Sequence, residues 1–329
     1  MPKISVVIVS REKIDLLGKA IDSVIDQSLS GKDYEIIIVD DGSDKDNYEK
    51  LILEKKKKFP NIKVVKQGKK SLAAGRNLGT REAKSEIIAF TDNDCLVDKN
   101  WLKEILDAFS EKEVIGVEGK IVTDTPRGLF TNAPENLSGK KFIGANSAYQ
   151  KEIIEKAGYY NEGMKFWRED SEFAFRAMQF GKIKFAEKTI VYHPLRKDPP
   201  ESVFRYLFFL RNEWICFFKQ PLKYLRYFRD EVVRDILKII VFYATTFGII
   251  FGILINNPLF SLFFIILISA LGFILFYISE HKKQIFSAPL KEKLLFGFYT
   301  WIKYLAYPIF AVYGFADALL FLLAEKVRK

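Results

Sequence analysis

The chain has 329 residues, of which 49% are hydrophobic and 15% aromatic, and its formal net charge is +10. Its two cysteines, Cys95 and Cys216, form no spaced pair, which excludes a disulfide or zinc framework and fits a reducing compartment. Of the 30 phenylalanines, 20 lie after residue 200, so we expect a soluble domain before that point and lipid-facing helices after it.

Short apolar runs alternate with helical patterns over the first 110 residues. We expect strands over residues 4–9, 35–39, 62–65 and 86–90, and helices over residues 14–29, 45–58, 71–84 and 101–109. The continuous apolar character of the strands is typical of parallel strands that are covered on both faces. The alternation therefore predicts an α/β fold with a mostly parallel, Rossmann-like sheet. No signal peptide precedes the first strand, so we expect this domain to stay in the cytoplasm.

Two acidic clusters follow predicted strands. The first is Asp-Asp-Gly-Ser at residues 40–43, and the second is Thr-Asp-Asn-Asp at residues 91–94. The carboxyl ends of parallel strands are where such sheets bind ligands. Closely spaced carboxylates suit a divalent cation, which can neutralise a departing diphosphate. The first cluster can accept hydrogen bonds from a base or a ribose, and either cluster alone also fits an ordinary solvated turn.

The pattern is looser between residues 114 and 200, where we expect a helix over residues 169–179 and a strand over residues 184–192. Residues 203–219 are rich in aromatic and basic side chains and predict an amphipathic helix in a membrane interface. Between Lys182 and Lys238, 13 Lys and Arg residues face 7 Asp and Glu residues, which favours attraction to anionic lipid headgroups. No base-stacking motif accompanies this charge, so we expect no nucleic-acid partner.

Three apolar stretches follow. Two of them, about 236–256 and 258–279, are long enough to cross a bilayer, which takes about 20 residues. The third, 294–323, contains Lys303 and Asp317 and predicts either a third span or a re-entrant hairpin. Lysines after the second stretch place both flanks of the first hairpin in the cytoplasm. We therefore expect a multi-pass protein of the cell membrane, with a cytoplasmic catalytic domain.

Six segments occur along the chain in a recognisable order. They are Ile4–Val9, Asp40–Ser43, Ala74–Gly79 (Ala-Gly-Arg-Asn-Leu-Gly), Thr91–Asp94, Gly144–Asn146 and Trp167–Asp170. In this order they resemble the family 2 inverting glycosyltransferases, which have the GT-A nucleotide-binding fold. The resemblance spans roughly residues 3–215. It implies a GT-A domain over residues 1–200, and the composition of the rest predicts interface helices over 201–235 and a transmembrane region over 236–329.

The resemblance also implies roles for individual residues. It assigns nucleotide-sugar binding to Val9, Asp40, Asp41, Arg76, Asp92 and Asn93. It assigns the binding of a divalent metal, Mn²⁺ or Mg²⁺, to Asp94 and His193, and it places Asn146 and Trp167 in the sugar and acceptor pocket. Asp170 resembles the general base, with Glu169 beside it. Each also has a structural reading, because Trp167 can simply pack, His193 can be structural, and acidic residues favour a helix start.

The chemistry of inverting transfer agrees with a carboxylate base. The transfer is one displacement in which an acceptor hydroxyl loses its proton, so a carboxylate such as Asp170 is needed within hydrogen-bond reach. Residues 210–214 (Leu-Arg-Asn-Glu-Trp) depart from the Gln-x-x-Arg-Trp segment of processive synthases, so we expect transfer of a single sugar. The loop after Val9 also departs from the family's Pro-x-Tyr-Asn.

The membrane-facing segments favour a lipid-linked acceptor. We expect transfer from a nucleotide-sugar donor to a hydroxyl of a lipid-linked saccharide. One alternative is a polyprenyl- or dolichyl-phosphate glycosyl synthase, whose acceptor phosphate is already ionised and needs no base. The other is a membrane scaffold that has kept the fold and lost the activity.

Overall fold

A computed structural model of the chain describes residues 1–11, 14–43, 45–123, 128–164, 166–260, 262–263 and 288–327. The chain divides into two compact units. The first comprises Met1–Thr125 and Ala133–Arg196, and the second comprises Pro126–Asn132 and Lys197–Lys329. The predicted boundaries at residues 200 and 235 stay predictions.

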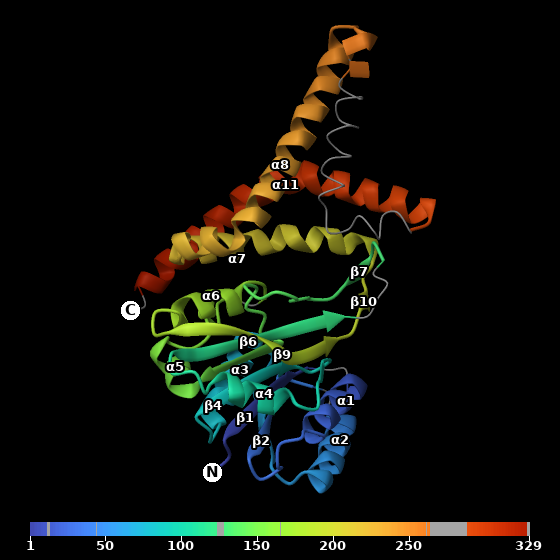
Figure 1. Cartoon of the computed structure of the whole chain (residues 1–329). Helices are drawn as coiled ribbons and strands as arrows, with labels where there is room; N and C mark the ends of the chain where they lie inside the picture. The colour runs from blue at the N-terminus through green and yellow to red at the C-terminus, as the bar shows by residue number, and fades with distance from the viewer. Residues whose placement is uncertain are drawn as a thin grey trace. The chain divides into compact units, whose positions relative to one another are not determined.

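An eight-stranded mixed sheet forms the centre of the first unit (Figure 1). Its strands are β1 (Ile4–Ser10), β2 (Tyr34–Asp40), β3 (Ile62–Lys66), β4 (Ile87–Asp92), β5 (Leu96–Val97), β6 (Val114–Thr123), β8 (Asn146–Gln150) and β9 (Lys182–His193). Their order is β3-β2-β1-β4-β8-β6-β9-β5. Strands β3, β2, β1 and β4 are parallel, as are β6 and β9, whereas β8 runs antiparallel to both of its neighbours. The predicted α/β class with a mostly parallel sheet is confirmed.

Helices cover the two faces of this sheet. They are α1 (Ile14–Ile25), α2 (Lys45–Lys58), α3 (Leu72–Glu82), α4 (Trp101–Ala108), α5 (Lys151–Lys156) and α6 (Glu169–Ala177). Successive strand residues point to opposite faces, so Val6 and Ile8 join the core cluster that contains side chains of α1 and α4, whereas Val7 joins the cluster that contains side chains of α3 and α6. Burial on both faces explains why these strands read as continuous apolar runs.

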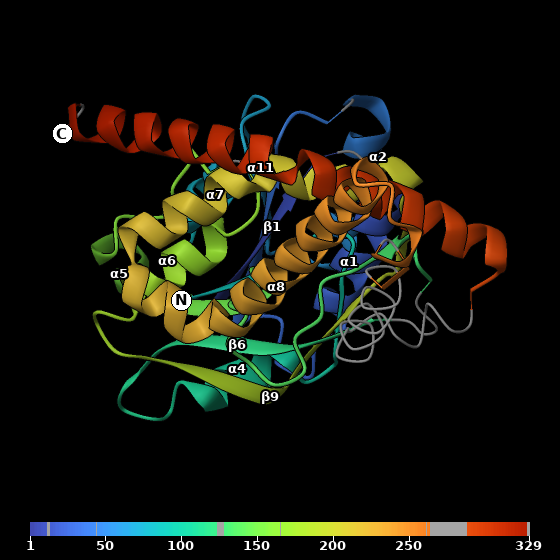
Figure 2. The same cartoon turned by 90° about the horizontal axis from the view of Figure 1, so that it is seen from above.

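The second unit is built mainly from helices. A two-stranded sheet pairs β7 (Thr131–Asn132) with β10 (Arg196–Lys197), and a short 3-10 helix η1 (Pro200–Phe204) follows. The long helices are α7 (Arg205–Lys219), α8 (Pro221–Leu254) and α11 (Leu290–Val327). Helices α7 and α11 lie side by side in both views (Figures 1 and 2).

Two helices of the second unit, α8 and α11, are long and apolar enough to cross a membrane. By length and composition the two helices are candidate spans. The predicted span 236–256 falls on the C-terminal half of α8, and the stretch 294–323 falls within α11. Most of the predicted span 258–279 lies outside the described residues.

Candidate functional site

Carboxylates and a histidine meet where two distant strands of the sheet end. Asp92 is the last residue of β4, and Asp94 and Cys95 lie in the turn that follows it, whereas His193 is the last residue of β9. One potential ligand atom from each of these four side chains lies within 4.8 Å of all the others. The antiparallel pairing of β5 with β9 brings these residues together. Leu96 lies opposite Tyr192, so Asp94 and Cys95, just before Leu96, lie near His193, just after Tyr192.

The donor set fits a hard divalent cation. Nδ1 of His193 lies 2.9 Å from the carbonyl oxygen of Pro194. A carbonyl only accepts hydrogen bonds, so Nδ1 is the donor in this contact, and in the neutral ring Nε2 is then the nitrogen with the lone pair. That Nε2 lies 3.7 Å from Oδ1 of Asp94. Two carboxylates and one imidazole nitrogen are ligands that Mn²⁺ accepts, and the carboxylates also suit Mg²⁺.

Cys95 belongs to this cluster geometrically, although no pattern in the sequence indicates it. The residue is fully buried, and burial raises the pKa of its thiol well above the usual value. A cysteine sulfur is a soft ligand, whereas Mn²⁺ and Mg²⁺ prefer carboxylate oxygens, so Cys95 suits these ions poorly. We therefore assign the metal-binding potential to Asp92, Asp94 and His193.

Arg196 is a second residue that sequence reasoning missed. Its guanidinium forms an ion pair with Oδ2 of Asp94. The Asp94 side chain is fully buried, whereas the Arg196 side chain is 46% exposed. Asp94 thus already carries one cationic partner, with which a metal ion would compete. The only signal in the sequence is a basic residue three positions after His193.

Arg76 links the acidic turn to α6. It projects from α3 and is buried, with Nη2 3.6 Å from Oδ1 of Asp92 and Nη1 3.4 Å from Oε1 of Glu169. Its guanidinium also lies 5.5 Å from the ring centroid of Tyr160. Burial raises the pKa of Asp92, and the charge of Arg76 works against that rise.

The start of α6 presents the predicted catalytic carboxylates. Glu169 is buried, and this burial together with the charge of Asp170 raises its pKa to about 7, although Arg76 opposes the rise. Asp170 is half-buried and accepts hydrogen bonds from the backbone N–H groups of Gly144 and Ser171, each at 2.8 Å. These two bonds fix the orientation of the Asp170 carboxylate.

The turn that leads into α6 is unusual in its backbone. Trp167 and Arg168 are consecutive non-glycine residues with φ values of 73° and 65°. Such conformations cost free energy and concentrate at functional sites. The guanidinium of Arg168 lies 5.3 Å from the ring centroid of Trp167, which is half-buried. The structure therefore gives Trp167 a packing partner, and its predicted contact with a sugar stays a prediction.

The first acidic cluster organises the loops at the end of β2. Asp40 accepts hydrogen bonds from the N–H groups of Gly42 and Ser43, and Gly42 has a φ of 91°, which suits glycine. Asp41 accepts from Nε2 of Gln67 and from the N–H of Lys70, at 2.8 and 2.9 Å. Both carboxylates lie at the strand end where nucleotide binding is predicted, and the contact itself stays a prediction.

Three further predicted residues have structural partners. Asn146 is buried, accepts a hydrogen bond from Nε1 of Trp101 at 2.8 Å, and donates to the carbonyl oxygens of Lys120 and Thr189. These three bonds occupy its amide inside the unit, so its predicted place in the sugar pocket has no support from this geometry. Nδ2 of Asn93 lies 3.4 Å from Oγ of Ser10. Val9 packs so close to α3 that a Cβ on Gly75 would lie 2.5 Å from it.

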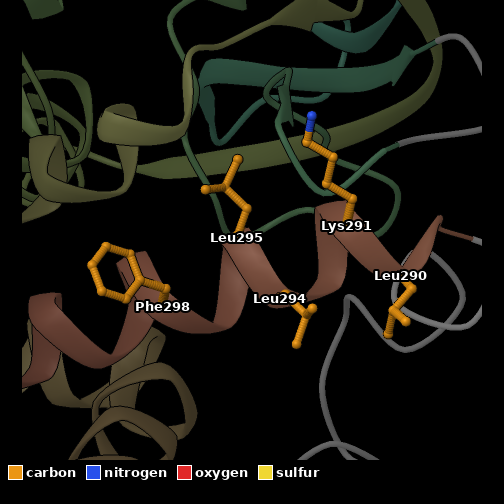
Figure 3. Close-up of a pocket in the computed structure, with 5 residues that line it drawn as sticks. All are labelled: Leu290, Lys291, Leu294, Leu295 and Phe298. Atoms are coloured by element: carbon orange, nitrogen blue, oxygen red, sulfur yellow. The ribbon is translucent and has the colours of Figure 1, made fainter.

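A shallow cavity of about 500 Å³ lies in the second unit. It is lined by Leu290, Lys291, Leu294, Leu295 and Phe298, all from the start of α11 (Figure 3). The lining offers one ammonium group and no carboxylate, so the cavity cannot provide the predicted metal ligands. The chemistry-bearing cluster belongs to the first unit.

Comparison with protein families gives a match to the family described as Glycosyl transferase family 2, over residues 5–178. The poly(ribitol-phosphate) beta-N-acetylglucosaminyltransferase TarP of Staphylococcus aureus (strain N315) is 31% identical over 137 residues, which are 40% of this chain and 41% of TarP. Glycosyltransferase AglE of Haloferax volcanii is 24% identical over 209 residues, 60% of this chain and 68% of AglE. The chain spans about two fifths of the length of the first curated relatives that it matches.

Solved structures show the same fold. S. aureus TarS 1-349 in complex with UDP-GlcNAc has a TM-score of 0.50 and 19% identity, covering 65% of this chain and 66% of that one. GalNAc-T7 with UDP, GalNAc and Mn²⁺ has a TM-score of 0.50 and 21% identity, covering 60% and 44%. The sheet of the first unit therefore has the GT-A fold that the sequence predicts.

Proposed function

The chain belongs to glycosyl transferase family 2, and we propose that it moves a single sugar from a nucleotide-sugar donor to a hydroxyl of a lipid-linked saccharide. In this proposal the transfer inverts the anomeric centre and depends on Mn²⁺ or Mg²⁺. The observation that carries the proposal is the buried chain of contacts from Asp92 through Arg76 to Glu169. It joins the carboxylates expected at the donor to those expected at the acceptor.

The donor side of the proposal rests on the acidic turn after β4. Asp92, Asp94 and His193 would hold the cation, and a bound cation would neutralise the charge that grows on the departing diphosphate. Arg196 adds a positive charge beside Asp94, which also favours an anion there. The complexes of TarS with UDP-GlcNAc and of GalNAc-T7 with UDP and Mn²⁺ support a nucleotide-sugar donor and a divalent metal.

The acceptor side rests on the start of α6. An attacking hydroxyl must lose its proton, and Asp170, oriented by two backbone N–H groups, is the proposed base. Glu169, with its pKa near 7, would hold Arg76 in place and supply the local negative charge. A polyprenyl or dolichyl phosphate would need no base. The presence of these two carboxylates therefore favours the hydroxyl acceptor over that alternative.

The lipid-linked nature of the acceptor rests on the apolar helices of the second unit. Helix α8 is long and apolar enough to cross a membrane, α11 carries many exposed apolar side chains, and the basic residues before α8 suit a cytoplasmic face. We therefore propose a protein of the cell membrane whose catalytic domain lies in the cytoplasm.

The test of the donor chemistry is release of nucleotide by detergent-purified protein. UDP-, GDP- and dTDP-sugars are offered one at a time with Mn²⁺ or Mg²⁺, and then with a chelator. We expect release from one donor, lost with the chelator and lost in Asp94→Asn. The control is Asp107→Asn, an exposed carboxylate on α4, which should keep wild-type release. A protein that binds neither nucleotide nor metal would instead be the inactive scaffold.

The test of the acceptor compares two lipid substrates in wild-type protein and in Asp170→Asn. With a lipid-linked saccharide, we expect transfer by the wild type and a loss of at least about 100-fold in the variant, because the general base contributes that much. Binding of the donor should stay unchanged. Transfer only to a polyprenyl phosphate, undiminished in Asp170→Asn, would establish the alternative function.

A further inference from the structure

Helix α11 docks on α7 through charged side chains. Nε of Arg211 lies 2.8 Å from Oδ2 of Asp317, and Nζ of Lys219 lies 2.8 Å from Oε2 of Glu325. Phe321 lies between these pairs, with its ring centroid 4.6 Å from the Arg211 guanidinium and 5.9 Å from the Lys219 ammonium. Both acidic groups in the second half of α11 are thus neutralised by α7.

The docked face continues along most of α11. Gly314 and Ala318 are buried, and a Cβ on Gly314 would lie 2.9 Å from the backbone nitrogen of Arg211, so the helices touch there. Nearer the start of α11, the ring of Phe310 lies 5.2 Å from that of Phe208, and Tyr299 lies 3.2 Å from Glu201. These contact residues follow one another at helical spacing, so a single face of α11 meets α7 and η1.

The opposite face of α11 is an exposed apolar stripe. From Leu290 to Val327, an exposed apolar side chain recurs every three or four residues. Four of them, Ile309, Val312, Leu320 and Leu323, are 73, 69, 66 and 51% exposed. A helix with one face docked on protein and the other exposed and apolar has the pattern of a helix that lies along an interface.

A span through the bilayer conflicts with the docked face. If α11 crossed the membrane, the paired charges of Asp317 and Glu325 would enter or approach the hydrocarbon together with their α7 partners. A charge at the bilayer centre is costly, and charged side chains are rare there. Helix α7 has 15 residues, about 22 Å, and so is too short to cross alongside. The pair therefore fits the membrane surface better than its interior.

We propose that α7 and α11 form a platform that lies in the plane of an anionic membrane surface, with the apolar stripe of α11 immersed at the acyl boundary. Together the two helices carry seven basic and four acidic side chains, and two of the acids are already paired between them. The remaining positive charge is complementary to anionic headgroups. Trp301 and Tyr313 on the exposed side suit the same depth. The proposal is independent of the catalytic chemistry.

The test measures the depth of single labels in the full-length protein, reconstituted into vesicles of phosphatidylcholine and phosphatidylglycerol. Leu294→Cys, Ile309→Cys and Leu323→Cys carry an environment-sensitive fluorophore at the start, middle and end of the stripe. Phe247→Cys on α8, where the side chain is 69% exposed, provides the reference for a candidate span. Cys95 and Cys216 are buried, so unsubstituted protein is the labelling blank. Lipids that carry a nitroxide near the headgroup or near the chain end serve as quenchers.

The platform predicts one quenching pattern along the whole of α11. All three labels should be quenched more strongly by the shallow nitroxide than by the deep one, and the ratio of shallow to deep quenching should be the same at all three positions. Phe247→Cys should be quenched more strongly by the deep nitroxide. Stronger deep quenching at Ile309→Cys alone would make α11 a span and overturn the proposal. Absence of lipid quenching at all three positions would overturn it as well, because the stripe would then face protein or water. In vesicles of phosphatidylcholine alone, quenching on α11 should weaken, and unchanged quenching would refute the anionic preference.

Discussion

Arg76 Nη1 lies 3.4 Å from Oε1 of Glu169, although 93 residues separate the two along the chain. Both side chains are buried, and a second carboxylate, Asp92, lies 3.6 Å from the same guanidinium. A buried cation without partners would be very costly, so each carboxylate helps to keep Arg76 inside the unit. A change in the charge of Glu169 should therefore affect Arg76 and, through it, Asp92 on the donor side of the site.

Activity should fall as the pH drops through about 7, because protonation of Glu169, whose pKa is raised to about 7, removes one of the two partners of Arg76. The measurement is the pH profile of kcat/KM. In Glu169→Gln the activity should be low and this acidic limb should vanish, whereas Glu155→Gln, an exposed carboxylate on α5, should keep it. An acidic limb that persists in Glu169→Gln would assign the titration to another group.

The same raised pKa affects stability. Glu169 binds its proton more tightly in the folded protein than in the unfolded chain, where its pKa is about 4.3. Its favourable contribution is therefore complete below about pH 4 and is lost as the pH rises through about 7. Between about pH 4 and pH 7, the wild type should therefore lose free energy of unfolding relative to Glu169→Gln, which has no group that titrates at this position. Chemical denaturation at several pH values measures this, and a difference independent of pH would contradict it.

Local pattern was enough to place two acidic clusters at the carboxyl ends of strands. In the parallel half of the sheet, β2 and β4 are largely apolar runs whose ends are marked by carboxylates, so Asp92 and Asp94 could be placed at the sheet edge from the sequence. The structure leaves their predicted ligand roles untested, but it does bring them together with His193.

What the sequence did not reveal depends on pairing between distant segments. Strands β6 and β8 were not predicted, because Gly116 and Gly119 interrupt the apolar run of β6 and β8 is rich in small and polar residues. Arg196 meets Asp94 through the pairing of β5 with β9, which no local periodicity encodes, whereas Cys95 directly follows Asp94 and shows no metal-site spacing in the sequence. Likewise, no motif predicts that the amide of Asn146 is occupied by internal hydrogen bonds.

Gly144→Ala should impair activity by displacing Arg76. A Cβ at this position would lie 2.2 Å from Nη2 of Arg76, and the backbone N–H of Gly144 is the donor to Asp170. Overpacking of this kind costs about 1–3 kcal/mol, so we expect a loss of stability as well as a loss of kcat. Gly68→Ala is the matched control, because a Cβ there meets nothing within 4 Å. Equal activities of the two variants would show that Arg76 tolerates the shift.

Glu118→Gln should destabilise the loop that leads to Gly144. The buried Glu118 carboxylate accepts hydrogen bonds from the backbone N–H groups of Lys140, Lys141 and Phe142 and from Nδ2 of Asn136. A glutamine replaces one accepting oxygen by an amide that can only donate, which leaves N–H groups unpaired. We expect a loss of about 2–3 kcal/mol in the free energy of unfolding.

The control for this change is Glu113→Gln, which replaces an exposed carboxylate just before β6 and should leave stability unchanged. Thermal unfolding of both variants provides the comparison. Because the loop also positions Gly144, hydrogen exchange of residues 139–144 should increase in Glu118→Gln. Wild-type stability in this variant would mean that water or another group satisfies the N–H donors.

Arg196→Gln should strengthen the binding of Mn²⁺ to the nucleotide-free protein. The Arg196 guanidinium is paired with Oδ2 of Asp94, a carboxylate proposed to bind the metal, so cation and arginine compete for the same oxygen. Because the arginine side chain is 46% exposed, the pair is worth about 1 kcal/mol, and its removal should raise the affinity roughly fivefold. Titration of Mn²⁺ monitored by electron paramagnetic resonance measures this without any turnover.

Lys188→Gln, which removes an exposed charge from the same part of the chain, corrects for the loss of one positive charge. An affinity in Arg196→Gln equal to or below that of Lys188→Gln would show that the arginine does not compete with the ion, and that Asp94 serves its partner Arg196 instead of a metal.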